Sequence, residues 1–156
     1  MEIRRTGNAS AIKKVLEELG RKEIKVGFFE SAKYPDGTPI AYVAAIQEFG
    51  HGPIPPRPFM RPAEQQNAAK WQKGIAAGVK AALNGAVTIE HALEQVGMVA
   101  AGDVRKAIKA VTAPPLARST VQARQRRLKG KKSASTKPLV DSGQMIQAVT
   151  SAVVDK

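Results

Sequence analysis

A chain of 156 residues with 43% hydrophobic residues is long enough for one domain with a modest core, but only 4% of its residues are aromatic, so that core must rest on aliphatic side chains and alanine. The absence of cysteine excludes disulfides and thiolate metal sites, which fits a reducing compartment. The formal net charge is +12, and no apolar run approaches the ~20 residues of a transmembrane helix, so we expect a soluble protein with no membrane partner, made in the cytoplasm.

The N-terminal part predicts a helix, a strand and a turn. Apolar side chains at i, i+3, i+4 and i+7 predict a helix over about residues 9–19, which Asn8 or Ser10 could cap. Alternating polar and apolar residues predict a strand at 23–28. Proline and glycine within 34–39 predict a turn.

A short helix and a proline-rich loop follow. Residues 41–49 predict a helix on which Tyr42, Ile46 and Phe49 share one face. The Pro-rich loop, about 50–61, cannot be regular helix because proline lacks an amide donor.

Two long helices, about 62–84 and 88–112, occupy the middle of the chain. Each carries an apolar stripe at helical spacing, and Thr88 is a good N-cap for the second. Gly74 and Gly78 stand four residues apart, a spacing that would permit close packing of another helix. Because this signal is weak in a soluble chain, we favour the interpretation that they are ordinary tolerated glycines.

The last part of the chain is basic at first. A basic flexible loop is predicted over about 113–137, with a short helix at 119–128 inside it. Asp141 is expected to open a turn and short helix within 139–148, and 149–154 has strand character. Together these elements predict a single α+β domain over the whole chain, with a small, mostly antiparallel sheet packed against several helices.

No constellation of side chains indicates catalysis. The two histidines, His51 and His91, lack partners at a metal-binding or catalytic spacing. Ser142 follows an aspartate but lacks the Gly-x-Ser-x-Gly elbow, so we expect Asp141, Ser142 and Gly143 to form a structural turn or helix cap. We therefore predict no catalytic residue, no metal and no cofactor.

Positive charge is concentrated between Asp103 and Asp141, where there is no acidic residue and where eleven of the 25 lysines and arginines lie. Three interpretations stay open: contact with nucleic-acid phosphates, docking on an acidic protein, or a solvated mobile loop. No aromatic residue lies between Leu116 and Leu139, which excludes stacking on bases there. The residues assigned to a DNA channel or an acidic partner are Arg118, Arg124, Arg126, Arg127, Lys129, Lys131 and Lys132.

The proline block at 53–62 is the most unusual local sequence, since its restricted residues keep it extended at little entropic cost. It is either a rigid linker that places Phe59 in the chain's own core or an arm that contacts a neighbouring subunit. The residues assigned to a subunit or partner interface are Pro55, Pro56, Arg57, Pro58, Phe59 and Arg61.

Three motifs occur in a fixed order along the chain. They are Ala41 to Gly50, which ends in Gln47-Glu48-Phe49-Gly50, then the block from Ile54 to Ala63, then Pro138 to Met145, which contains Leu139-Val140-Asp141-Ser142-Gly143. In type and order they resemble the tail-completion and head–tail connector (neck) family of tailed bacteriophages and the related virion morphogenesis and minor tail proteins. The resemblance extends from about residue 24 to the C-terminus. The ordered set is more specific than any one of its motifs.

The resemblance implies a small α+β structural protein that forms a homo-oligomeric ring in the virion neck or at the proximal end of the tail, without catalysis or cofactor. The implied partners are further copies of the chain, other phage neck, connector or tail-terminator proteins, and packaged DNA contacted without sequence preference. The implied location is the virion, after assembly in the bacterial host cytoplasm. A nonspecific nucleic-acid-binding protein that acts through the basic segment stays open as the alternative function.

Overall fold

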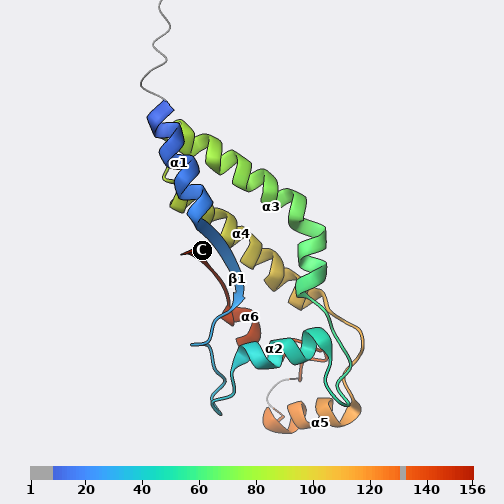
Figure 1. Ribbon diagram of the computed structural model, residues 1–156. Coiled ribbons are helices and arrows are strands. Elements are labelled where there is room, and N and C mark those ends of the chain that lie inside the picture. Colours follow the sequence, from blue (N-terminus) through green and yellow to red (C-terminus); the bar gives the residue numbers. More distant parts are fainter. Residues whose placement is uncertain (1–8, 131–132) are drawn as a thin grey trace, which may run out of the picture. The chain divides into compact units, whose positions relative to one another are not determined.

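The helices and strands begin and end within a few residues of their predicted positions. The computed structural model describes residues 9–130 and 133–156, so the predicted cap Asn8 lies outside the described residues. Within them the chain forms six helices and a two-stranded antiparallel sheet, which confirms the α+β class with two long helices in the middle (Figure 1). In chain order the elements are α1 (Ala9–Arg21), β1 (Lys22–Phe28), α2 (Ile40–Phe49), α3 (Met60–Leu83), α4 (Ile89–Ala110), α5 (Arg118–Arg127), α6 (Gln144–Ala148) and β2 (Val149–Asp155).

Two compact units make up the described chain, and each is assembled from segments that are distant in sequence. Unit 1 consists of residues 9–26, 67–100 and 151–156. Unit 2 consists of residues 27–66, 101–130 and 133–150. Both strands and both long helices contribute residues to each unit. The predicted single domain over residues 1–156 therefore stays a prediction.

Unit 1 has an aliphatic core to which helices and both strands contribute. Ala82, Ile89 and Leu93 are buried at its centre. The side chains that pack against them are Val15, Leu19, Ile24, Ile75, Val79, Val87 and Val153. The inward-facing residues of α1 and α3 follow the helical spacing that the sequence predicts.

Within unit 1, α3 and α4 run antiparallel and approach each other closely at two glycines (Figure 1). A Cβ atom at Gly78 would lie 2.8 Å from the Cβ of Ala92, and one at Gly74 would lie 3.2 Å from a methyl group of Val96. The interpretation of these two residues as ordinary tolerated glycines is therefore wrong. Their missing side chains make room for α4, which outweighs the roughly 1 kcal/mol by which each glycine disfavours a helix.

Unit 2 is built around Phe59, which is 1% exposed. Its ring meets the ring of Phe28 in β1 edge to face, with centroids 6.1 Å apart and planes at 87°. Ile40 and Ala44 form part of the buried face of α2, and α2 packs against α6. Other buried apolar residues of this unit are Ala63, Ala101, Val104, Ile108, Leu139, Met145 and Val149.

The turn predicted at 34–39 is confirmed in detail. The amide of Gly37 donates to the carbonyl of Tyr34 over 2.9 Å, and Gly37 has a φ of 85°. The carboxylate of Asp36 accepts a 2.9 Å hydrogen bond from the amide of Thr38, and this bond is the first cause of the lowered pKa of Asp36. The turn is thus stabilised by the residue types that its sequence supplies.

Candidate functional site

Glu48, in the last turn of α2, caps the start of α3. The residue is 4% exposed. Its Oε2 accepts hydrogen bonds from the amides of Phe59, at 2.7 Å, and Met60, at 2.9 Å, while Oε1 accepts one from the amide of Arg61, at 3.2 Å. The first amides of a helix have no partner inside the helix, and its N-terminus carries partial positive charge. A carboxylate from another helix therefore satisfies and stabilises the beginning of α3.

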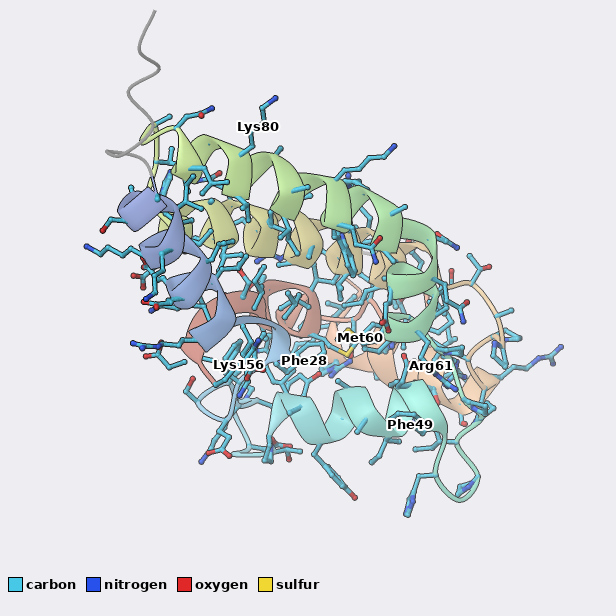
Figure 2. The ribbon with its side chains drawn as sticks, turned by 45° about the horizontal axis from the view of Figure 1, so that its top comes forward. Phe28, Phe49, Met60, Arg61, Lys80 and Lys156 are labelled. Atoms are coloured by element: carbon cyan, nitrogen blue, oxygen red, sulfur yellow. The ribbon has the colours of Figure 1, made fainter. Side chains whose placement is uncertain are left out.

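The side chain of Arg61 completes this arrangement. Its Nε donates to Oε1 of Glu48 over 2.9 Å, and its Nη2 donates to the backbone carbonyl of the same residue over 3.1 Å. The guanidinium also lies 5.1 Å from the centroid of the Phe49 ring, as a cation–π pair (Figure 2). Arg61 thus binds the end of α2 to the first turn of α3.

The pKa of Glu48 is lowered by this environment. Burial is the largest influence and by itself would raise the pKa. The hydrogen bonds from the amides of Phe59 and Met60, and then from Arg61, together outweigh burial. Glu48 is therefore a buried carboxylate that stays ionised at neutral pH.

Arg57 joins the proline block to the segment after α4. The residue is 5% exposed. Its Nε donates to the carbonyl of Pro114 over 2.7 Å, and its Nη2 donates to that of Pro115 over 3.1 Å. Its Nη1 donates to the side-chain oxygen of Gln47 over 3.1 Å, and its amide donates to the backbone carbonyl of Gln47 over 2.6 Å. Fixed guanidinium donors suit several carbonyls at once.

Arg124 of α5 plays the corresponding role for the segment before α6. It is 8% exposed, and burial is the main cause of its lowered pKa, with Asp141 acting in the opposite direction. The guanidinium remains charged because the pKa of arginine is so high. Its Nη atoms donate to four backbone carbonyls at 2.9–3.1 Å, those of Ser135, Lys137, Pro138 and Val140. This one side chain therefore holds most of the segment in place.

Asp141 pairs with the arginines of α5 and does not cap α6. Its Oδ2 lies 2.6 Å from Nη2 of Arg127 and 3.7 Å from Nε of Arg124. The N-cap position of α6 is Gly143, at a φ of 82°, and no side chain caps the helix. The predicted capping role of Asp141 is therefore wrong, because two guanidinium groups attract its carboxylate more strongly than backbone amides do. The chain bends at Asp141, Ser142 and Gly143, where the sequence predicts a turn.

A cleft of about 540 Å³ opens between the 34–38 turn, α2, α5 and the segment that leads into α6. Its walls include Tyr34, Gln47, Leu139 and the Arg127–Asp141 ion pair. Burial raises the pKa of the Tyr34 phenol, and the nearby carboxylates of Asp141 and Asp36 raise it further. The phenol therefore stays protonated at neutral pH.

In the described part of the chain, the hydroxyl of Ser142, which lines this cleft, is not hydrogen-bonded to a general base. The hydroxyl of Ser142 donates to the amide oxygen of Gln144 over 3.3 Å, and an amide oxygen cannot act as a general base. Among residues 9–130 and 133–156, no three His, Asp or Glu side chains are grouped so as to hold a metal ion. No helix in the same part of the chain is both long and apolar enough to cross a membrane.

Of the six residues that the sequence assigns to a partner interface, two are buried and four are exposed. Arg57 and Phe59 lie in the interior of unit 2, so the prediction that they contact a neighbouring subunit is wrong for these two. The linker interpretation describes them better, because Phe59 fills the chain's own core. The residues of the set with exposed surface are Pro55, Pro56, Pro58 and Arg61.

The basic residues are separated in a similar way. Arg124 is buried and satisfied by carbonyls, so its assignment to a DNA channel or acidic partner is wrong. Arg127 pairs with Asp141 although its side chain is largely exposed. Arg118, Arg126 and Lys129 are exposed, while Lys131 and Lys132 lie outside the described residues.

Sequence reasoning missed three of the most connected side chains of unit 2: Glu48 as a helix cap, and Arg57 and Arg124 as buried donors. One signal was present for Glu48, since it shares a helical face with Ile40 and Ala44 and so occupies a buried position. For the arginines there was no such signal, because their acceptors are backbone carbonyls, which every residue has.

Comparisons of this chain with models of known protein families, with curated proteins and with solved structures found no match.

Proposed function

We propose that this chain is a structural virion assembly protein of a tailed phage or prophage, acting in the neck or proximal tail, where it takes part in tail completion or head–tail joining. It acts as a homo-oligomeric ring that binds neck, connector or tail-terminator proteins. It has no catalytic role.

The observation that carries the proposal is that the three resemblance motifs meet in unit 2, the first two in one polar network and the first and third along one cleft. Glu48 of the first motif caps the helix that the second motif begins, through Phe59 and Arg61. Gln47 of the first motif and Asp141 of the third line the same cleft. Residues that recur together because they hold one fold together are expected to interact in this way. The motif set therefore supports a shared architecture with the neck and tail-completion family.

Exposed apolar side chains support assembly with other subunits. Tyr42 is 57% exposed and Phe49 is 67% exposed, and both stand on the outer side of α2 in unit 2. Unit 1 also exposes large apolar residues, namely Ile12, Leu16, Met98 and Val99. Aromatic residues and methionine are enriched where proteins bind one another, and apolar patches on a surface mark such sites.

Electron microscopy of particles from a phage that lacks this gene tests the proposal. The expected result is filled heads with separate tails, or tails with a faulty proximal end. Supplying the wild-type gene in trans should restore joined virions, and so should Lys80→Gln, which changes an exposed lysine of unit 1. Normal infectious virions without the gene would refute the proposal.

The alternative function is nonspecific nucleic-acid binding through the basic segment, which the exposed bases Arg118, Arg126 and Lys129 favour. The two functions differ in what the free protein does. A dedicated DNA-binding protein would leave particle assembly intact when deleted, whereas loss of an assembly protein stops head–tail joining.

A further inference from the structure

We propose that the outer face of α5 binds the closely spaced phosphates of a nucleic acid, which in a phage neck are those of double-stranded DNA. The face consists of Arg118, Gln122 and Arg126, followed by Lys129 just after the helix. The proposed function supplies only the source of the DNA. Binding itself is a property of the free chain and is tested without the virion.

These cations differ from other basic residues of the segment, whose side chains already have partners within the chain. The guanidinium of Arg124 donates to backbone carbonyls, Arg127 forms an ion pair with Asp141, and Lys137 donates to the carbonyl of Lys109. In the part of the chain that the structure describes, Arg118, Arg126 and Lys129 form no ion pair or side-chain hydrogen bond. Their charge is therefore available to a ligand.

Helix geometry places the cations on one side of α5. At 100° per residue, Arg118, Gln122 and Arg126 fall within about 80° of the helix circumference, and the buried Arg124 lies about 160° from the middle of that sector. The eight-residue separation of the two arginines corresponds to about 12 Å along the helix axis. One DNA strand presents a charge per roughly 3.4 Å of axis, so the face spans about three or four phosphates.

The buried face of α5 makes this arrangement rigid. Arg124 ties the helix to the carbonyls of residues 135–140, so the exposed cations project from a fixed support. A preorganised face loses less conformational entropy on binding than a mobile loop does. The basic segment thus contains a helix without any ligand, at Arg118–Arg127, close to the short helix predicted at 119–128.

The composition of the face favours a phosphate backbone over an acidic protein. Protein interfaces depend on aromatic or large apolar anchors at their centre. The exposed residues of α5 are polar, basic or small: Arg118, Ser119, Thr120, Gln122, Ala123, Gln125, Arg126 and Arg127. The α5 helix itself exposes cations and no large apolar side chain, although Leu128, between the helix and Lys129, is 39% exposed. Such a face binds charge without reading bases, and no aromatic residue is present in this segment to stack on them.

Fluorescence anisotropy of the full chain with a short mixed-sequence DNA duplex, measured as a function of salt, tests the proposal. Three phosphate contacts predict a slope of about −2.7 in log K against log salt, and thus an affinity that falls about 40-fold between ~50 and ~200 mM salt. Arg118→Gln, Arg126→Gln and Lys129→Gln should each reduce the slope by about one, so that the fall becomes about 12-fold. A second duplex of unrelated sequence should give the same values.

The matched controls are Lys73→Gln and Lys80→Gln, which remove the same charge from exposed positions of α3 (Figure 2 labels Lys80). They should leave the slope unchanged, and far-ultraviolet circular dichroism should show the same fold for all variants. Equal slopes for the α5 variants and the wild type would overturn the proposal, as would equal losses in the controls. Tighter binding to polyglutamate than to the duplex would overturn it in favour of an acidic protein partner.

The result is separable from that of the virion experiment. DNA binding by α5 together with normal virions from the deletion phage would refute only the proposed assembly function. Separate heads and tails with no α5-dependent DNA binding would refute only the proposal that α5 binds DNA phosphates.

Discussion

Replacing Glu48 with glutamine keeps the length of the side chain and removes its charge. In the native protein the two carboxylate oxygens accept from three backbone amides, and Oε1 also accepts from the guanidinium of Arg61. Glutamine offers one acceptor oxygen, and its amide nitrogen is a donor. Whichever way the amide is turned, two of the four donors face another donor.

The expected loss is about 3 kcal/mol, from two charge-assisted hydrogen bonds at about 1.5 kcal/mol each. The small exposure of Glu48 means that water cannot easily replace these bonds. For a chain of this length, about 3 kcal/mol corresponds to a drop in Tm of about 6–12 °C. Thermal unfolding followed by circular dichroism measures it. The control is Glu64→Gln, an exposed position near the start of the same helix, which should change stability by less than about 0.5 kcal/mol.

The effect should also depend on pH with a definite sign. The pKa of Glu48 is lowered in the folded protein, so the unfolded chain binds a proton more readily. The stabilisation is therefore complete above the unfolded pKa of about 4.3 and is lost as pH falls through the lower folded pKa. The Tm difference between wild type and Glu48→Gln should shrink over that acidic range. A difference below about 1 kcal/mol at pH 7, or one that grows on acidification, would refute the capping argument.

Three further predictions concern the remaining features of the fold. Arg124→Met should destabilise unit 2 by about 3 kcal/mol, because several backbone carbonyls lose their hydrogen-bond donor. Amide hydrogen exchange within residues 133–140 should therefore become faster, and protection equal to that of the wild type would contradict the role of this side chain. Gly78→Ala should lower the free energy of unfolding by about 1–3 kcal/mol, because the new Cβ would collide with Ala92. The control Gly102→Ala, which has open space around it, should be neutral or stabilising by up to about 1 kcal/mol. Chemical denaturation measures both variants. Tyr42→Ser should leave Tm within about 1 °C of wild type and weaken self-association in analytical ultracentrifugation; unchanged association would remove α2 from the interface.

Local features of this chain could be predicted well because their causes are local. Thr88 is an example, since its hydroxyl accepts a 3.1 Å hydrogen bond from the amide of His91 at the start of α4, as a threonine before an apolar stripe suggests. The short helix inside the basic segment is a second example, predicted at 119–128 and found at Arg118–Arg127. In both cases the decisive interactions lie within one helical turn.

The contacts of the glycine pair and of Asp141 could not be predicted in the same way. The local sequence around Gly78 does not show whether another helix crosses at this residue. Only the packing of α4 against α3 shows that a Cβ atom at Gly78 would lie 2.8 Å from the Cβ of Ala92. Asp141 precedes a short helix, as a capping residue would, yet the arginines of α5 lie close enough to take its carboxylate. Spatial neighbours decided both outcomes.

The sequence by itself determined the order and type of the elements, because apolar periodicity, proline and glycine act over a few residues. It also placed the positive charge in one segment of the chain. Only the tertiary structure decided which of those charges are buried. Arg124 and Arg126 are two residues apart with similar neighbours, yet one is enclosed by the carbonyls of residues 135–140 and the other faces solvent. A helix turns by about 200° over two residues, so the fold can use one arginine internally and leave the other for a partner.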